Sequence, residues 1–506
     1  MSAQRGPGHP PPADGDAGAD ELVAHLRRRP GDVLERAGAS DATSFERAFL
    51  LLAPGHTWTA PLGGATDGVV ARLESSERAS AVDRRWREHR RGLGAVERSG
   101  SSVVVRRGVP DHLVKVGDAE ALDLLLAREP GLGVELVATL PPSSVVAPAV
   151  VEHGAAPEPR VPAVLSHPGA SCRRYDGGVL LTRTALAHHG RSVLPESFRW
   201  FLDTDPAVSG LRDTGNGTGR LEPTAYDDAR SAPPDAGQDE HLAGSFYHFG
   251  YENPGHFGHL MTEALSRLWA WPEAKRADPG LKVLCRHHPR RHRPGRAALE
   301  RTLLIAFGVA PEDLVWTGGR THVDTLVGCT PLWHNTVPLS AHVAIRDTWQ
   351  RLGDGLRDRA GDAARVERVF VTRRAAGHNR TCHNVGEVER LAEEEGYTVV
   401  EPERLSLPDQ AALFGGARVV AGLGGAGMFN TALATRLEKI VVLNHTGYHA
   451  RNEHLVAAVL GAESETFWSE PDMLPRHERD YRAHQSAWSV DLGRHEAGIR
   501  RALRTA

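Results

Sequence analysis

The sequence predicts an α/β protein, and two observations carry this prediction. From residue 246 onward, short β-branched runs alternate with segments of helical period, which is the order in which parallel sheets are built. In addition, one buried-type strand at 417–421 leads through a glycine cluster into a helical stretch, a turn suited to holding phosphate. The chain has 506 residues with 40% hydrophobic content, which is enough for two or three cored domains.

The N-terminal part of the chain gives a weaker pattern. Residues 1–19 are rich in Pro, Gly, Ala and Asp, so we expect a disordered tail there. Residues 20–130 contain amphipathic pieces at 21–26 and 44–52 and a short strand at 103–105, which predict a mostly helical region of unknown role. Strand patterns follow at 134–138, 145–151 and 178–182, and a polar stretch at 204–241 reads as a long surface loop.

The alternating part falls into two sets. The first is expected to contain strands near 246–249, 281–284, 314–316 and 325–327, and helices at 256–271 and 296–307. A helix at 340–359 leads to the second set, with strands at 368–372, 397–400, 417–421 and 439–443 and helices at 384–395, 407–414 and from 426. We therefore expect one α/β lobe at 131–360, a second at 361–470, and a tail at 471–506 whose helix returns to the first lobe.

Composition excludes several classes of function. The net charge of −4 comes from 60 basic and 64 acidic residues, which leaves no global field to attract nucleic acid. The sequence shows no secretory signal and no apolar stretch long enough to span a membrane. The four cysteines lie far apart, which is typical of reduced thiols. These features predict a cytoplasmic protein without an integral membrane segment, and they leave the oligomeric state open.

The glycine cluster Gly422-Leu-Gly-Gly-Ala-Gly427 has two readings. Backbone N–H groups of such a turn can approach an anion, and the helix that follows adds partial positive charge. Gly422, Gly424 and Gly427 also fit the Gly-x-Gly-x-x-Gly pattern of dinucleotide-binding folds, so an NAD(P)-dependent oxidoreductase is an alternative. A nicotinamide site requires an acidic residue after the next strand, and Asn444 stands there. The pattern therefore favours the diphosphate of a sugar nucleotide.

An ordered series of residues around this turn resembles glycosyltransferase family 61, in its bacterial-type members. The series comprises 369–373, Arg380, Asn384, Glu387, 401–403, Gln410, Phe414 and 422–430. Upstream, the segment 255–269 is similar to the family's helix with a His-x-x-x-Glu/Asp pattern, here His259 and Glu263. The resemblance spans roughly 175–460. Two positions depart from it: Gly424 replaces a frequent His, and Phe257-Gly258 replaces an aromatic pair.

The resemblance implies a GT-B architecture of two Rossmann-like lobes, with the donor bound by the second. It also implies inverting, metal-independent transfer of a sugar, most often from a UDP-sugar, to a hydroxyl of a glycan, a lipid-linked glycan or a small molecule. No cofactor is implied. The donor contacts that it implies here are Arg373, Arg380, Glu403, Gln410, Gly424, Gly425, Ala426, Gly427 and Asn430, and candidate acceptor contacts are His256 and Asn253.

The residues at these positions suit the chemistry of glycosyl transfer. His259 and Glu263 are spaced i, i+4, so they project from one helical face, and we assign Glu263 as general base with His259 as its partner or substitute. Arg373 follows a strand and Arg380 lies in a loop, where guanidinium groups can bind a diphosphate in place of a metal ion. Without the resemblance, each would be read as an exposed arginine.

Other features are explained more simply without a function. Asp203-Thr-Asp205 has the spacing of a metal-dependent transferase, but it precedes a Pro and reads as a turn, so no metal ligand is predicted. The basic run at 286–293 reads as a solvated loop. A nucleotide-sugar-binding protein without catalysis also stays open, because Gly424 lacks the side chain frequent at that position.

Overall fold

We analysed a computed structural model of the chain. It describes residues 34–35, 57–61, 67, 71, 93–107, 122, 125–126, 128–157, 160–181, 187–190, 192–197, 222–225, 228–230, 239–251, 254–286, 294–335, 339–361, 366–374, 380–448, 450–475 and 481–504. Several sequence predictions lie outside these residues, namely the tail at 1–19, the helices at 21–26 and 44–52, Asp203 and Asp205, Asn253, and most of the basic run (287–293). The chain divides into two compact units, which are described separately.

The first unit comprises 1–135, 175–243 and 319–326. Its strands β1 (Leu34–Glu35), β2 (Thr57–Pro61), β3 (Leu93–Ser99) and β4 (Ser102–Arg107) form a sheet in the order β1-β2-β4-β3. Strand β4 confirms the predicted strand, and Val103 and Val105 on it are fully buried. The neighbouring β2 and β3 were missed. Short antiparallel strands follow at β10 (Ala187–His189), β11 (Ser192–Val193), β12 (Glu222–Ala225) and β13 (Asp228–Arg230).

The second unit comprises 136–174, 244–318 and 327–506 and contains two sheets with parallel strands. The first sheet carries the parallel strands β14 (Glu240–His248), β15 (Lys282–Arg286) and β16 (Leu314–Thr317). Helices α7 (Trp271–Ala277) and α8 (Pro294–Phe307) connect them, as the alternation predicts. Strands β9 (Ala170–Leu181) and β17 (Thr321–Cys329) are each divided between the two units, at residues 174/175 and 326/327.

The structure also contains β5 (Gly133–Leu140), β6 (Ser143–Val146), β8 (Val164–His167), β18 (Trp333–His334), β19 (Ser340–Ala341) and single 3-10 turns at Pro195–Ser197, Pro311–Asp313 and Pro402–Arg404. Helix α9 (Ile345–Arg357) is shorter than predicted, because residues 340–341 pair as strand β19. Its fully buried Trp349 and Leu352 belong to one hydrophobic cluster that includes residues from both sheets.

The second sheet has six strands, all parallel, in the order β21-β20-β22-β23-β24-β7. Strands β20 (Arg368–Val371), β21 (Thr398–Val400), β22 (Val419–Leu423) and β23 (Lys439–His445) confirm four predictions, whereas β24 (Glu463–Ser469) was missed. The sixth, β7 (Val150–His153), comes from the part of the chain expected in the first lobe. Every residue of β22 and β23 is buried, as expected for strands covered on both faces.

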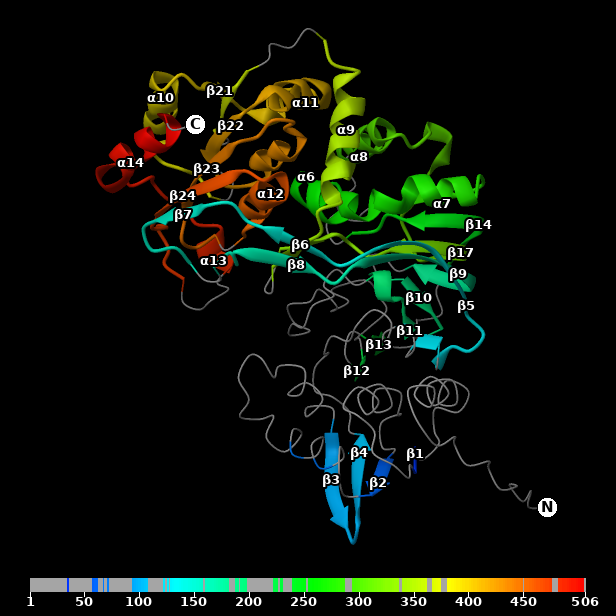
Figure 1. The fold of residues 1–506 in the computed structure, drawn as a ribbon. Helices are drawn as coiled ribbons and strands as arrows, with labels where there is room; N and C mark the ends of the chain where they lie inside the picture. The colour runs from blue at the N-terminus through cyan, green and yellow to red at the C-terminus, as the bar shows by residue number, and fades with distance from the viewer. Residues whose placement is uncertain are drawn as a thin grey trace, which may run out of the picture. The chain divides into compact units, whose positions relative to one another are not determined.

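Helices cover both faces of the second sheet. Val369, Val420 and Ile440 face a cluster with α11 (Leu407–Gly416) and α12 (Asn452–Leu460). The intervening residues on the same strands face α10 (Val385–Glu394) and α14 (Leu492–Arg504). Figure 1 shows α10 and α14 together on one side of these strands and α11 and α12 on the other. The alternation of strand residues between two helical layers is the arrangement of a doubly wound α/β sheet.

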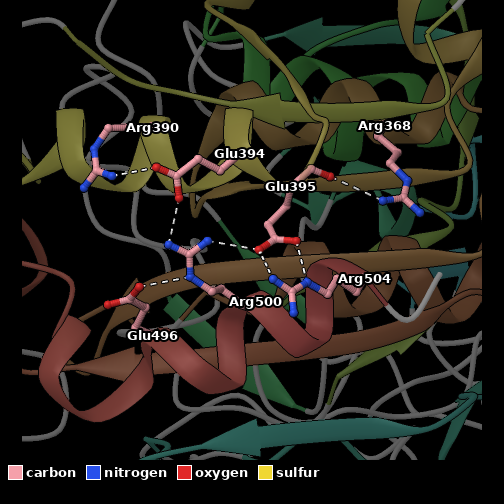
Figure 2. Close-up of polar contacts among 7 residues, drawn as sticks. All are labelled: Arg368, Arg390, Glu394, Glu395, Glu496, Arg500 and Arg504. Atoms are coloured by element: carbon pink, nitrogen blue, oxygen red, sulfur yellow. Dashed lines mark hydrogen bonds and ion pairs between the residues drawn. The ribbon is translucent and has the colours of Figure 1, made fainter.

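The C-terminal helix α14 packs on the second sheet, whereas the sequence analysis expected it to return to the first lobe. Ile499, Ala502 and Leu503 are buried against α10 and the sheet, and burial of a Leu or Ile side chain contributes about 1.5–3 kcal/mol. Figure 2 shows why the charged face of α14 also faces α10: Arg500 and Arg504 both bind Glu395, at N–O distances of 3.0 and 2.7 Å.

The ion network gives a prediction for acid stability. The hydrogen bonds from Arg504 and then Arg500 lower the pKa of Glu395 to about 2, from 4.5. A depressed folded-state pKa stabilises the fold above pH 4.5, and this contribution is lost as the pH falls toward 2. We expect Glu395→Gln to lower the urea midpoint at pH 7, and we expect its difference from the wild type to disappear by pH 2.

The control is Glu496→Gln, since Glu496 is exposed and pairs with the same Arg500 at an N–O distance of 2.9 Å. This variant should change the urea midpoint much less, because an exposed i, i+4 pair contributes little. Equal effects of the two substitutions, or a Glu395→Gln effect that persists at pH 2, would contradict the role assigned to Glu395.

No helix in the described part of the chain has the length and apolar character needed to cross a membrane.

Candidate active site

The glycine turn lies at the switch point of the second sheet. Five of its six strands are consecutive in the chain, β20 to β24, and their spatial order β21-β20-β22-β23-β24 reverses direction between β20 and β22. The carboxyl ends of such neighbouring strands form the crevice in which doubly wound sheets bind ligands. Strand β22 ends at Leu423, and Gly424 and Gly425 then lead into the 3-10 helix η8 (Ala426–Leu433). Strand β20 ends at Val371, two residues before Arg373.

Two arginine side chains approach this turn. A side chain at Gly425 would place its Cβ 3.2 Å from Nη2 of Arg380 and 3.5 Å from Nη1 of Arg373. Gly425 has a φ of 145° and a ψ of −171°, a conformation that is essentially restricted to glycine. The pKa of Arg373 is lowered by burial and by the charge of Arg380. The two guanidinium groups therefore repel each other beside a turn that admits no side chain.

Arg380 is held in an unfavourable state. Its backbone has a φ of 60°, which is uncommon for a residue other than glycine, and its N–H donates to the Gln485 carbonyl at 3.0 Å. Its guanidinium carbon lies 4.1 Å from the centre of the Tyr448 ring, a cation–π contact. The buried Nε and Nη1 groups have no hydrogen-bond partner among the described residues. A buried donor without a partner costs about 1–3 kcal/mol, so these groups suit an anion that supplies acceptors.

The structure explains why Gly424 has no side chain. A Cβ at this position would lie 2.4 Å from Nδ2 and 2.8 Å from Cγ of Asn444, which is buried at the end of β23. The N–H of Gly424 donates to the Leu443 carbonyl at 3.0 Å and so extends the pairing of β22 with β23. The side-chain amide of Asn444 thus occupies the space next to the turn that a residue at 424 would otherwise fill.

Beneath the turn lies a carboxylate that the sequence analysis missed. Glu453, in the first turn of α12, is 2% exposed and accepts the Gly425 N–H at 2.8 Å. Burial raises its pKa, and the charges of Arg380 and Arg451 oppose that rise. A carboxylate in the first turn of a helix is normally explained by the helix dipole, so its presence in the sequence does not indicate this contact.

The His259–Glu263 pair forms as the spacing predicted, but on an irregular helix. The predicted regular helix is α-helical only at α6 (Phe257–His259), π-helical at Leu260–Ala264 and 3-10 at Leu265–Ala270. Groups from outside the helix bind its carbonyls, since Trp349 Nε1 donates to Met261 at 3.1 Å and the Leu332 N–H donates to Ser266 at 3.2 Å. Single π-helical turns occur frequently at functional sites.

The geometry of the pair distinguishes its two members. His259 Nδ1 lies 2.6 Å from Glu263 Oε1, and the exposed fractions of the two side chains are 26% and 7%. His256 caps the same helix, accepting the His259 N–H at 3.5 Å, and its ring lies 4.8 Å from that of His259. The imidazole of His259 is therefore the member that faces outward, and the carboxylate is the member that holds it.

This pair lies next to the helix that follows the glycine turn. A side chain at Gly258 would place its Cβ 2.8 Å from the ring of Phe429, on η8, so α6 and η8 pack closely at this point. The loop before α6 has a similar contact. Gly255, whose φ is 74°, donates its N–H to the Glu300 carboxylate at 2.6 Å, as Gly425 donates its N–H to Glu453. The structure thus brings the predicted base helix and the predicted donor turn together.

The other predicted donor residues are engaged locally. Gln410 is buried, and its Nε2 donates to the Leu405 carbonyl at 3.0 Å. Glu403 is exposed and raises the pKa of Arg373 slightly, against the larger effects of burial and Arg380. Asn430 donates to the Gly427 carbonyl at 3.2 Å, and its buried Oδ1 has no partner in the described part of the chain. Ala426 begins η8 and is half-buried.

The second unit is thus an α/β fold in which Arg373 and Arg380 approach a glycine turn at the switch point of the second sheet, and a His–Glu pair lies on the neighbouring helical segment. Residues 257–441 match the family described as Glycosyltransferase 61, and this range runs from α6 through the glycine turn to β23. The chain thus carries a glycosyltransferase family 61 domain, and the protein is a glycosyltransferase that uses a donor and an acceptor substrate. No curated protein matches the chain. Asn444, Tyr448 and Glu453 lie outside the matched range.

Proposed function

We propose that the protein is an inverting, metal-independent glycosyltransferase that takes a sugar from a nucleoside diphosphate donor, with UDP-sugars as the first candidates. In this proposal the two sheets of the second unit are the two halves of a GT-B arrangement. The donor binds at the carboxyl end of the second sheet, and the acceptor binds beside α6. The observation that carries the proposal is Arg380, whose buried Nε and Nη1 have no partner in the described part of the chain and lie by the glycine turn and Arg373.

The diphosphate is stabilised by these guanidinium groups as it departs. The bond from the anomeric carbon to the β-phosphate oxygen breaks, and its electron pair stays on that oxygen. Arg373 and Arg380 can bind the developing charge bidentately, a role that a divalent cation has in other transferases. The N–H groups of Gly424 and Gly425 are already bound by Leu443 and Glu453, so the first N–H groups of η8, at Ala426 and Gly427, are the backbone donors that remain for phosphate.

The proton of the acceptor hydroxyl passes to the His259–Glu263 pair as the new bond to the anomeric carbon forms. The sequence assigned Glu263 as the base, with His259 as its partner or substitute. The greater exposure of His259 supports the arrangement in which His259 is the base. Glu263 accepts the Nδ1 hydrogen of His259, and Nε2 of His259 takes the proton of the acceptor hydroxyl. A buried carboxylate that orients an imidazole is a common arrangement for a general base.

A donor screen with EDTA present tests this proposal. UDP-sugars, other nucleoside diphosphate sugars and NAD(P) are compared by thermal shift, and positive donors are then assayed for transfer with detection of product anomers. A ligand at a hundredfold excess over its Kd stabilises the fold by about 2.7 kcal/mol, which is easily detected. We expect stabilisation by a UDP-sugar and inversion of the anomeric centre. Stabilisation by NAD(P) alone would refute the proposal, and tight UDP binding without turnover would indicate a binding protein.

A further inference from the structure

The Glu453 carboxylate is placed where an anion-binding site normally has none. It is 2% exposed and contacts Gly425, the glycine that the guanidinium groups of Arg373 and Arg380 both approach. Its Oε1 accepts the Gly425 N–H at 2.8 Å, a charge-assisted hydrogen bond that is stronger than a neutral one. Because Gly425 has a backbone conformation essentially restricted to glycine, the orientation of its peptide depends on such a contact.

We propose that Glu453 is a positioning residue of the diphosphate site, which fixes the Gly425 peptide and supplies negative charge next to Arg380 until the donor binds. The proposal rests on the function proposed above. It deepens that function by assigning to α12, beyond the matched family range, control over the donor turn. Glu453 itself does not contact the reacting atoms, and it acts through Gly425 and Arg380.

The charges around Glu453 support this role. Arg380 and Arg451 both favour its ionised form, and the ring of the buried Tyr448 contacts the guanidinium group of Arg380. Arg451 is already bound to Glu152 at 3.0 Å, so Arg380 is the cation whose pairing changes when a ligand arrives. Before donor binding, the carboxylate offsets one of two guanidinium charges that repel each other. After binding, the negative charge of the diphosphate offsets the guanidinium charge in place of the carboxylate, and the diphosphate repels the Glu453 carboxylate.

This exchange makes donor binding sensitive to the protonation of Glu453. Burial already raises the pKa of this carboxyl, and a nearby diphosphate raises it further, because like charges disfavour ionisation. Binding therefore takes up a proton, and rising pH weakens donor affinity through Glu453. UDP titrates as well, so the effect is read as a ratio between wild type and variant under identical conditions, which cancels the titration of the ligand.

The test compares Glu453→Gln and Glu453→Ala with the wild type, by calorimetric titration with UDP and with inorganic pyrophosphate between pH 5.5 and pH 8. Gln keeps an acceptor for the Gly425 N–H and removes the charge, whereas Ala removes both. We expect the ratio of the wild-type Kd to the Glu453→Gln Kd to rise with pH by about tenfold, equivalent to one pKa unit of coupling. We expect Glu453→Ala to bind both probes at least tenfold more weakly than Glu453→Gln at every pH.

A matched control is Glu463→Gln, since Glu463 is exposed at the start of β24, the end of the strand remote from the turn. It should bind UDP as the wild type does. A flat ratio for Glu453→Gln, or equal affinities of the Gln and Ala variants, overturns the positioning role even if both variants lose stability. If Glu453→Ala does not fold, the pH ratio of Glu453→Gln decides alone. A wild type that binds neither UDP nor pyrophosphate refutes the proposed function, and this inference with it.

Discussion

Substitution of Arg380 by Ala is expected to lower kcat by about 10²–10³-fold, the usual effect of removing one donor that stabilises transition-state charge. Arg380→Lys should not restore the activity, because an ammonium group cannot reproduce the two N–H groups, Nε and Nη1, that a diphosphate would bind. Steady-state rates with the donor found in the screen, together with calorimetric Kd values for UDP, check both variants.

Stability separates this role from a structural one. Arg380→Ala removes two buried donors without partners in the described region, and it loses the cation–π contact and the side-chain hydrogen bond with Tyr448. We expect its free energy of unfolding to stay within about 1 kcal/mol of the wild type, since such a contact contributes about that amount. A variant that unfolds readily but binds UDP normally would show that Arg380 supports the fold alone.

The neighbouring Arg374 is the matched control. It binds Glu389 bidentately, with Nη2 at 2.7 Å, and Glu389 is 8% exposed. Its removal leaves a buried carboxylate without that partner, so Arg374→Ala should lower stability and leave UDP affinity unchanged. Arg373 and Arg374 are adjacent in sequence, but Arg373 approaches Gly425 whereas Arg374 pairs with Glu389, a difference in side-chain direction that the sequence does not reveal.

Local patterns predicted most of the second unit. The strands β20 to β23 and the helices between them follow from apolar period and turn residues, because each element is defined by residues close in sequence. Strand order is a long-range property and gave no such signal. The pairing of β7 with β24 joins residues 150–153 to residues 464–467, and nothing in either segment predicts the other. The packing of α14 on α10 depended likewise on a charge match between segments about 100 residues apart.

The candidate site divides in the same way. The glycine turn and the His259–Glu263 spacing are local, so the sequence revealed them. The contacts of Asn444 and Glu453 with the turn, and of Tyr448 with Arg380, were missed because they join segments that are brought together only by the strand order. The π-helical residues Leu260–Ala264 were also missed, since they result from hydrogen bonds to the helix carbonyls from distant groups.

Substitution of His259 by Asn is expected to lower kcat by about 10²–10⁴-fold, the contribution of a general base. The donor KM should change little, because the ring lies on α6 and the diphosphate contacts lie on the second sheet. Glu263→Gln should lower kcat less, since Gln keeps an acceptor for the Nδ1 hydrogen at the 2.6 Å contact and loses only the charge. Rates at saturating donor, measured across pH for both variants, provide the check.

The pH profiles distinguish the two assignments of the base. If His259 takes the proton, its Asn variant loses the acidic limb of the rate profile, and imidazole added to His259→Ala restores part of the activity. If Glu263 takes the proton, Glu263→Gln loses that limb and the His259 variants keep it. The greater exposure of His259, 26% against 7%, predicts the first outcome, because an acceptor hydroxyl can approach the imidazole edge while the carboxylate stays covered by the helix.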